Sequence, residues 1–332
     1  MNTDFAVVGI GNALVDVLAQ ATDEFIENQG LAKGSMMLID TDQAVSLYET
    51  MGPGVEISGG SAANTMAGIA SFGGRSAFVG RVNADQLGDV YSYDLRAAGV
   101  HFVSVKESEG TPTGRCLILV TPDAQRTMNT YLGASSEFSP EDIDANLIST
   151  SAITYLEGYL WDQPSAQEAF RYAAQIAHQS SRRVALTLSD GFVVERHRDG
   201  FLELLDGDVD ILFANETEIC SLYEVNSFDE ALKRVTGTCE IAALTRGPQG
   251  AVLKRGDAVH IIDPLPVPGG VVVDTTGAGD LFAAGVLHGL AEGLDLGDAG
   301  RLGALAAAEI ISHIGARPEQ RLADLATANN LL

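Results

Sequence analysis

The sequence predicts an α/β protein with a mostly parallel central sheet and a small antiparallel β-sheet lid, and two observations lead there. Short apolar runs alternate with amphipathic stretches along most of the chain, which is typical of βαβ units. Two regions interrupt this alternation with β-favouring runs that have no helix between them. No linker, low-complexity tract or repeat divides the 332 residues, so we expect one domain, 1–332, with lid segments inserted at about 13–58 and 100–132.

The elements follow in chain order. We predict buried strands at Phe5–Gly9, Ala77–Gly80, Ala152–Leu156, Val184–Leu188, Asp210–Ala214 and Ile241–Thr245. Helices are predicted at Ser61–Phe72, Leu87–Ala98, Ser165–Gln179, Glu216–Tyr223, Phe228–Thr236, Asp280–Glu292 and Asp298–His313. The lid runs are Ser35–Asp40, Val55–Ser58 and Phe102–Leu132, and in the last of these a TPDAQ turn joins two strands as a hairpin.

Composition excludes several classes of partner. With 46% apolar and 20% charged residues the chain is expected to fold rather than remain disordered. Twenty Lys and Arg against 45 Asp and Glu give a net charge of −25, so nucleic acid and anionic membranes are not expected partners. An anionic ligand would be repelled at long range, and its site must therefore be built locally from backbone N–H groups, one or two Arg and a divalent cation.

Cysteine usage and the N-terminus predict a cytoplasmic protein. Cys116, Cys220 and Cys239 are odd in number and widely spaced, which favours reduced thiols over disulfides or a metal site. Neither a signal sequence at Met1–Phe5 nor an apolar run long enough to span a membrane is evident.

The strongest motif lies in Val271–Val286, VVVDTTGAGDLFAAGV, which predicts a strand, a glycine loop and a helix starting near Asp280. Gly277 and Gly279 allow backbone N–H groups to converge at the helix N-terminus, where the helix dipole favours an anion. Asp280 would then lie within the anion site. The other interpretation is structural: Asp280 caps the helix and GAG is a tight turn.

The segment DTTGAGDLFAAGVL resembles the C-terminal signature of the ribokinase-like (PfkB) family of carbohydrate and nucleoside kinases. This resemblance implies a ribokinase-like three-layer fold, Asp280 as the general base for the acceptor hydroxyl, and Gly277, Ala278 and Gly279 as the anion hole for the transferred phosphoryl group. Phosphoryl transfer depends mostly on positioning and charge neutralisation, so a carboxylate beside amide donors is sufficient chemistry.

Motifs of competing functions are incomplete. Walker A requires Gly-Lys, and no lysine here follows a glycine. His197-Arg198-Asp199 spells the HRD of protein kinases without the residues that should follow it, and no DFG occurs. The N-terminal VVGIGNALVD begins like a dinucleotide fingerprint, but Leu14 replaces the third glycine.

Three motifs in the N-terminal half predict the acceptor site. The Asn12-x-x-x-Asp16 spacing resembles the adenosine kinase members of the family, which implies Asp16 on two ribose hydroxyls and Asn12 near the base. A carboxylate can accept both hydroxyl protons. SGGSAANTMAGIASFGG resembles the family's first signature, which implies that Gly59 and Gly60 let a sugar approach and that Asn64 binds a sugar hydroxyl. Taken singly, these motifs also fit a solvated turn and tight packing.

Two further segments resemble the family's nucleotide half. Asn215-Glu216-Thr217-Glu218 resembles its NxxE motif, which implies Asn215 near the phosphates of ATP and Glu218 on the water shell of Mg²⁺; Mg²⁺ retains several waters, so an outer carboxylate is reasonable. Leu244–Val252, LTRGPQGAV, resembles its T-(K/R)-G-x-x-G loop. A hairpin turn is the other interpretation of that loop. The resemblance places ATP on these residues: Thr245, Arg246, Gly247 and Gly250.

The lid hairpin contains Arg126, at the position of an arginine that adenosine kinases move onto the phosphates. A mobile arginine is a suitable local cation in a chain of this charge, although surface arginines are common on hairpins. Asp274, Thr276 and the Gly315 region correspond to the family's monovalent-cation loop. The resemblance therefore implies a possible K⁺ dependence.

The acceptor remains open between a nucleoside, adenosine first, and a free sugar such as ribose or fructose. Asn12, PTGRC and TLSDGF are similar to adenosine kinases, whereas Thr187 and Asp190-Gly191 depart from their pattern. A non-catalytic sugar or nucleoside sensor on the same fold is a second alternative, against which Asp280 argues. Both a monomer and a homodimer are compatible with the sequence.

Overall fold

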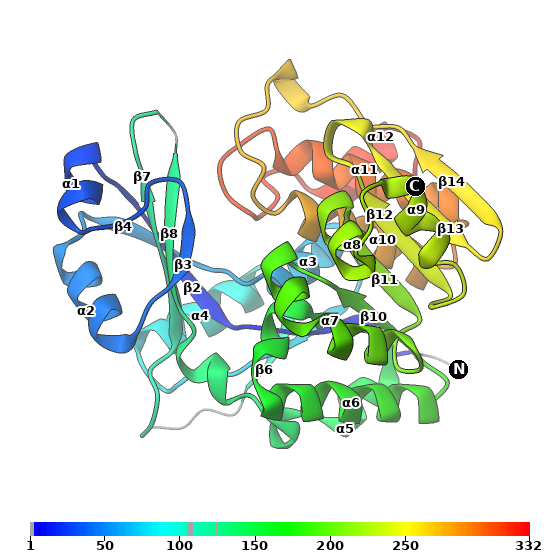
Figure 1. The fold of residues 1–332 in the computed structure, drawn as a ribbon, viewed down its shortest axis with the longest axis horizontal. Coiled ribbons are helices and arrows are strands. Elements are labelled where there is room, and N and C mark those ends of the chain that lie inside the picture. The colour runs from blue at the N-terminus through cyan, green and yellow to red at the C-terminus, as the bar shows by residue number, and fades with distance from the viewer. Residues whose placement is uncertain (1–2, 105–108, 124) are drawn as a thin grey trace.

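The computed structural model describes residues 3–104, 109–123 and 125–332. The predicted lid residues 105–108 and 124, and the N-terminal Met1, lie outside the described residues. The chain forms a large α/β body from which a small sheet projects on one side (Figure 1). Within the described ranges, no helix combines the length and apolar character needed to cross a bilayer.

The body is built on a nine-stranded sheet, counted over the described residues, with the order β14-β13-β12-β11-β10-β9-β1-β5-β6. Pairing is parallel from β12 to β6, and β13 and β14 extend the sheet as an antiparallel hairpin. The strands are β1 (Phe5–Ile10), β5 (Ser76–Val79), β6 (His101–Val103), β9 (Ser151–Glu157), β10 (Arg183–Thr187), β11 (Ile211–Asn215), β12 (Ile241–Thr245), β13 (Ala251–Arg255) and β14 (Ala258–Ile262).

Helices cover both faces of this sheet, and two hydrophobic cores result. Neighbouring strand residues point to opposite faces, so Val7 joins one core and Val8 the other. The first core is completed by α3 (Ser61–Ser71), α4 (Gln86–Ala97), α10 (Ala278–Ala291), α11 (Leu296–Ile310) and α12 (Leu322–Ala328). The second is completed by α5 (Ala145–Thr150), α6 (Pro164–Gln179), α7 (Gly191–Leu205), α8 (Glu216–Tyr223) and α9 (Phe228–Arg234). The predicted α/β three-layer fold is confirmed.

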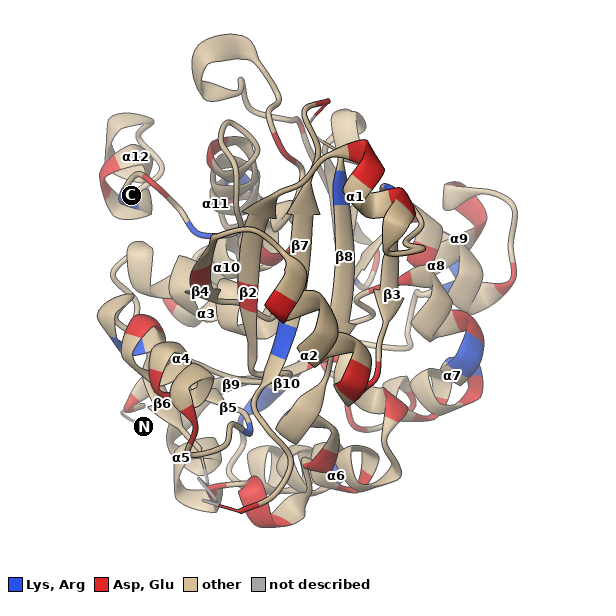
Figure 2. Cartoon of the chain, turned by 90° about the vertical axis from the view of Figure 1, so that its left-hand side faces the viewer, with Lys and Arg blue, Asp and Glu red and all other residues tan. Residues whose placement is uncertain are grey.

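The lid is a separate five-stranded sheet, again counted over the described residues, in the order β3-β8-β7-β2-β4. Its strands are β2 (Leu14–Gln20), β3 (Met36–Leu38), β4 (Gly54–Ser58), β7 (Gly114–Val120) and β8 (Arg126–Tyr131), accompanied by α1 (Asp23–Asn28) and α2 (Thr41–Thr50). Figure 2 looks onto this sheet. The predicted β7–β8 hairpin is present, but the sheet is mixed rather than antiparallel, because β2 pairs with β7 and β3 with β8 in parallel.

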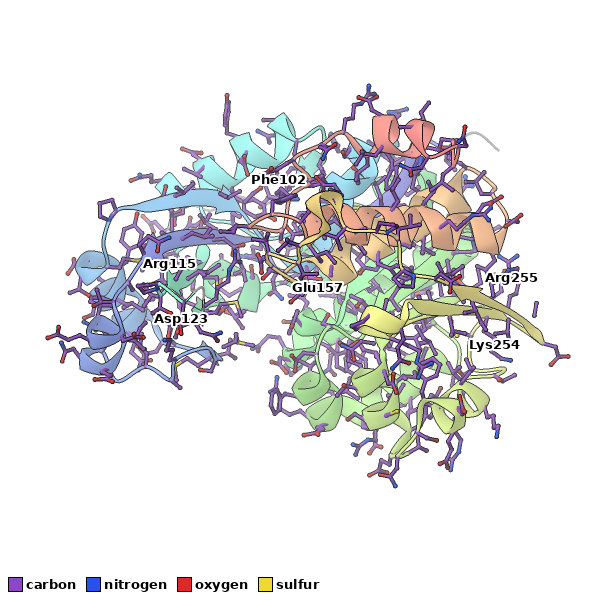
Figure 3. All side chains as sticks on the ribbon, turned by 90° about the horizontal axis from the view of Figure 1, so that it is seen from above. Phe102, Arg115, Asp123, Glu157, Lys254 and Arg255 are labelled. Atoms are coloured by element: carbon purple, nitrogen blue, oxygen red, sulfur yellow. The ribbon has the colours of Figure 1, made fainter. Side chains whose placement is uncertain are left out.

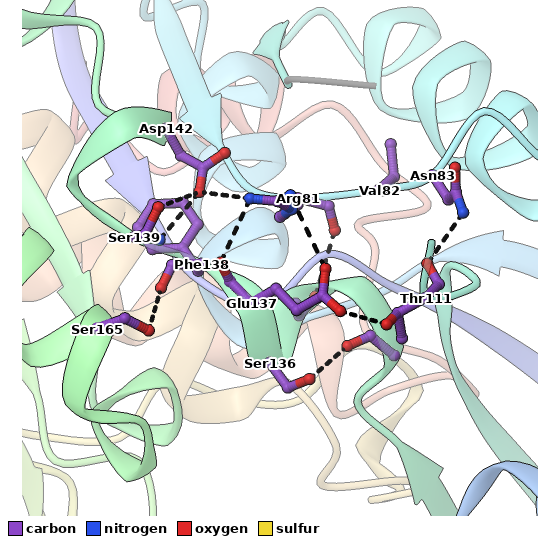
Figure 4. A network of polar contacts seen from close by, with 12 residues as sticks. Arg81, Val82, Asn83, Thr111, Ser136, Glu137, Phe138, Ser139, Asp142 and Ser165 are labelled. Carbon is purple, nitrogen blue, oxygen red and sulfur yellow. Dashed lines mark hydrogen bonds and ion pairs between the residues drawn. The ribbon is translucent and has the colours of Figure 1, made fainter. Parts of the chain in front are cut away.

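A polar network fixes the base of the lid to the body (Figure 4). Arg81, after β5, forms ion pairs with Asp142 at 3.4 Å and with Glu137 at 3.8 Å. Glu137 also accepts a hydrogen bond from Thr111, whose carbonyl accepts one from Asn83. Since Thr111 precedes β7 and Glu137 follows β8, both ends of the lid hairpin are tied to one loop of the body.

Two predicted β segments differ from the structure, and a long helix was not predicted. His101–Val103, predicted as part of the lid, is an edge strand of the large sheet beside β5. The strand predicted at 271–273 is absent: Val271, Val272 and Val273 lie in a loop and are 63%, 54% and 48% exposed. Helix α7 was not predicted, because its apolar spacing is interrupted at His197, where φ of −125° breaks the helical geometry.

Candidate active site

The loop before α10 places glycine amides at the start of that helix. Gly277, with φ of +78°, precedes the first turn, and α10 begins at Ala278. A side chain at Gly277 would press on Ala316, whose Cβ lies 2.9 Å from the position of the added carbon. The Ala278 N–H donates to the Thr275 carbonyl at 3.2 Å. The first N–H groups of a helix have no partner within it, so among the three predicted amides those of Gly277 and Gly279 are the better placed for an anion.

Asp280 lies in the first turn of α10, but its side chain does not cap the helix. Gly277 holds the capping position, without a side-chain bond. The carboxylate of Asp280 instead accepts hydrogen bonds from Ser61 Oγ at 2.6 Å and from Asn64 Nδ2 at 2.9 Å (both on α3). The structure therefore excludes the capping interpretation and directs the two oxygens of Asp280 toward α3.

Electrostatics make Asp280 a better base than a free aspartate. Burial raises the pKa of its carboxyl above the usual range, while the hydrogen bonds from Ser61 and Asn64 and the charge of Arg317 lower it again. A carboxylate with a raised pKa accepts a proton from an alcohol more readily. The arrangement therefore suits general base chemistry.

The predicted acceptor residues gather around the turn between β4 and α3. Burial raises the pKa of Asp16, on β2, to about 7, although the charges of Arg317 and Arg126 lower it. A side chain at Gly59 would overlap the Asp16 carboxylate, and one at Gly60, where φ is +93°, would overlap the Asn12 carbonyl oxygen. The two glycines thus allow the chain itself to pack closely, in agreement with the tight-packing interpretation, and the approach of a sugar stays a prediction.

Glu157, at the end of β9, joins this group and escaped the sequence analysis. Its carboxylate accepts hydrogen bonds from the Asn12 backbone N at 3.3 Å, from Asn12 Nδ2 at 2.9 Å and from the Ala62 backbone N at 2.8 Å. Burial raises its pKa to about 7. Figure 3 labels Glu157 where the lid strands meet the body. The available signal was a glutamate ending the apolar strand SAITYLE.

Two adjoining cavities lie next to Asp280, which lines the smaller one. The larger, of about 480 Å³, is mostly apolar, and the predicted loop residues Gly247 and Gly250 line it. The smaller, of about 170 Å³, is more polar and includes both Asp280 and Glu218 in its lining. The two cavities share these lining residues: Thr245, Gly279 and Phe282. The N-terminal end of α10 therefore lies where the two cavities meet.

Asn215 and Glu218 form a capping box at the start of α8. Glu218 Oε2 accepts from the Asn215 backbone N at 2.9 Å, and Asn215 Oδ1 accepts from the Glu218 backbone N at 2.9 Å. Burial, with a smaller contribution from the nearby carboxylates of Asp190 and Asp280, raises the pKa of Glu218 to about 7. No three described His, Cys, Asp or Glu side chains form a cluster that could hold a metal alone. Carboxylates that repel one another across a small cavity nevertheless fit a hydrated Mg²⁺.

Arg246 is the predicted nucleotide residue whose side chain turns away. Its Nε donates to Glu216 Oε2 at 3.1 Å, and the guanidinium carbon lies 4.2 Å from the centre of the Phe228 ring. Arg246 lines neither of the two cavities, although its neighbour Thr245 lines both. Its side chain thus connects α8, through Glu216, with α9, through Phe228.

Arg126 and Asp274 join the lid to the loop before α10. Arg126 Nη2 lies 2.7 Å from Asp274 Oδ2, and the two side chains are 12% and 10% exposed. Asp274 also accepts hydrogen bonds from the Thr276 backbone N and Oγ1 and from the Gly315 backbone N. Both Asp274 oxygens are therefore occupied, so the donor set as it stands does not fit the predicted K⁺, and we derive no step through that ion.

Comparisons with known proteins agree with this geometry. A model of the pfkB family carbohydrate kinases matches residues 33–321. An adenosine kinase from Sinorhizobium meliloti of known structure is 48% identical, with a TM-score of 0.89 over 98% of this chain and 99% of that chain. A probable sugar kinase from Rhizobium etli CFN 42 is 47% identical, with a TM-score of 0.92 over 99% and 100%.

Adenosine kinase 1 of Arabidopsis thaliana is 25% identical over 334 residues, which cover 94% of this chain and 95% of the relative. The family match extends over most of the chain, and the fold, the glycine loop and the cavities agree with it. The chain therefore belongs to the PfkB family of carbohydrate kinases, which are ATP-dependent.

Proposed function

We propose that the protein transfers the γ-phosphoryl group of ATP to the primary hydroxyl of adenosine, with Asp280 as the general base. The observation that supports this most is the position of Asp280, which Ser61 and Asn64 hold beside the amide-lined start of α10. The acceptor oxygen bonds to the γ-phosphorus as the bond from that phosphorus to the β–γ bridging oxygen breaks. ADP leaves, and the hydroxyl proton passes to Asp280.

The nucleotide has a matching place on the body. The apolar cavity of about 480 Å³ suits the base and ribose of ATP, and the phosphates would run toward Gly279, which both cavities share. The amides of Gly277 and Gly279 stabilise negative charge on the transferred group, and the Ala278 amide joins them when it exchanges its hydrogen bond to the Thr275 carbonyl. Mg²⁺ would neutralise phosphate charge, with Glu218 on its water shell and Asn215 near the phosphates.

Adenosine is proposed as acceptor for two reasons. The chain is 48% identical to the S. meliloti protein named as an adenosine kinase, and its Asn12 and Asp16 spacing resembles that group. Asp16 offers a carboxylate for a ribose diol. Asn12 donates one side-chain N–H to Glu157, and its second N–H and its Oδ1 are the groups that would contact a nucleobase.

An ADP-release assay with Mg·ATP tests the acceptor against adenosine, inosine, guanosine, ribose and fructose, with and without K⁺. We expect the highest kcat/KM with adenosine. Preference for ribose or fructose would retain Asp280 as base but overturn the nucleoside assignment, and the R. etli relative named as a probable sugar kinase makes this the main competitor. Tight binding of one acceptor without ADP release would indicate a sensor.

Asp280→Asn tests the proposed base. We expect kcat to fall by about 100-fold or more, because an amide cannot accept the proton, while adenosine binding measured by calorimetry changes only a few-fold. Ser61→Ala is the matched control: it removes one donor to Asp280 and leaves the base, so a loss of less than about tenfold is expected. Equal losses of binding and turnover in Asp280→Asn would contradict the assigned role.

A further inference from the structure

Arg317 makes three hydrogen bonds that link the β4–α3 turn to the C-terminal part of the chain. Its Nη1 donates to the Ala63 carbonyl at 2.6 Å, and its Nη2 donates to the Ser58 carbonyl at 2.8 Å and to Ser58 Oγ at 3.0 Å. Its Nε is buried without a hydrogen-bond partner. One planar guanidinium thus hydrogen-bonds to Ser58 before the turn and to Ala63 after it, and both residues lie more than 250 positions away in sequence.

The segment that carries Arg317, residues 312–321, is itself anchored. Glu309 Oε1 accepts hydrogen bonds from the backbone N of Glu319 at 3.0 Å and of Gln320 at 2.9 Å. Asp274 Oδ2 accepts from the Gly315 backbone N at 3.0 Å, and Ala316 lies against Gly277. Arg317 therefore extends from a segment that is fixed to the anion-binding loop.

The turn that Arg317 holds contacts both the acceptor carboxylate, Asp16, and the proposed base, Asp280. Gly59 lies against the carboxylate of Asp16, and the Gly59 carbonyl accepts a hydrogen bond from Tyr91 Oη at 3.3 Å. Ser61 and Asn64, at its helical end, are the donors to Asp280. A shift of this turn would move the acceptor carboxylate relative to the base.

We propose that Arg317 is a positioning residue for phosphoryl transfer. It holds the β4–α3 turn so that Asp16 and Asp280 keep their positions relative to the anion-binding loop, residues 274–279. This inference rests on the proposed function. A lysine at position 317 could not make the same set of hydrogen bonds, because a single ammonium group cannot reach two carbonyls and a hydroxyl with the planar geometry of a guanidinium. The positive charge of Arg317 also lowers the pKa of Asp16 and of Asp280, the two carboxyls on either side of the turn.

The test compares Arg317→Gln and Arg317→Lys with Arg321→Gln. Arg321 is a control from the same segment, with a side chain 65% exposed and an ion pair of 3.6 Å to Asp324. We expect Arg317→Gln to lower kcat by about 10- to 100-fold with the KM for Mg·ATP changed less than about threefold, because the larger cavity, proposed for the base and ribose of ATP, has no lining residue from the turn. Arg317→Lys should recover part of kcat, and Arg321→Gln should match the wild type.

The rate is measured per folded molecule, with the active fraction taken from titration of bound nucleotide. An unchanged kcat on that basis, with only a lower melting temperature, would mean a structural role and would overturn the inference. If Arg317→Gln does not fold, Ser58→Ala, Arg317→Lys and the double variant replace it. Their effects on kcat should be non-additive, and independent effects would overturn the inference.

The two proposals fail in different ways. A wild-type enzyme that releases no ADP with any acceptor removes the proposed function and this inference with it. An active wild type with a fully active Arg317→Gln variant removes only the role of Arg317.

Discussion

The backbone at Gly250 admits no other residue, and the neighbouring Gly247 provides a control for that statement. Gly250 has φ of +80° and ψ of −134°, a region open essentially to glycine alone, and an added Cβ would overlap the Ile262 carbonyl oxygen. Gly247 has φ of +54° with open space around the missing Cβ. Both residues line the larger cavity, so they differ in their backbone region and in this steric overlap rather than in their location.

We expect Gly250→Ala to lower the free energy of unfolding by about 3 kcal/mol or more, and Gly247→Ala by about 1 kcal/mol, the cost of left-handed backbone alone. Urea denaturation without nucleotide measures both values. Equal losses would mean that the chain around Ile262 moves aside, contrary to the packing seen here.

Motifs could predict where residues stand along the chain but not which way each side chain turns. The segment LTRGPQGAV placed Thr245, Gly247 and Gly250 beside a cavity, yet Arg246 in the same motif turns to Glu216. Glu157 and Arg317 were missed for a related reason. Their partners lie 95 to 259 positions away in sequence, and no local pattern records such contacts.

At the scale of elements, predictions held where the determining contacts are local. Helix α8 was predicted with both of its ends, because the Asn215 and Glu218 capping box marks its start within four residues. The strand predicted at 271–273 was wrong, since β-branched residues form a strand only beside a partner, and this segment borders the larger cavity instead. The parallel pairing within the lid depends on the route of the chain between distant strands, which sequence patterns do not specify.

The ion pair between β8 and the loop before α10 gives a prediction at this scale. Arg126 and Asp274 are largely buried, so their attraction is screened less than that of a surface pair. A double-mutant cycle with Arg126→Gln and Asp274→Asn should give a coupling energy of about 1–3 kcal/mol in the free energy of unfolding.

The matched control for that cycle is Arg321 with Asp324, whose side chains are 65% and 74% exposed. Its coupling energy should stay below about 0.5 kcal/mol. Similar values for the two pairs would show that the lid is not held to the body by Arg126 and Asp274 in the ligand-free protein.

At the scale of the whole molecule, the charge of −25 acts on the two proposed substrates differently. Acidic positions are spread over the helices around the lid (Figure 2), and Asp190, Glu218 and Asp280 add negative charge near the smaller cavity. Arg126, a cation close by, is paired with Asp274. Mg·ATP is an anion, so the field of the protein should oppose its approach, whereas adenosine is neutral.

Salt should therefore accelerate the capture of one substrate and not of the other. Raising tetramethylammonium chloride from about 10 to about 200 mM shortens the screening length from about 30 to below 10 Å. We expect kcat/KM for Mg·ATP to rise about two- to tenfold, and kcat/KM for adenosine at saturating Mg·ATP to change less than about twofold. Tetramethylammonium is chosen because it is too large to replace K⁺ at a protein site. A fall in kcat/KM for Mg·ATP would show that the amides of α10 and Arg126 outweigh the net charge of the molecule, so that attraction at the site governs nucleotide capture.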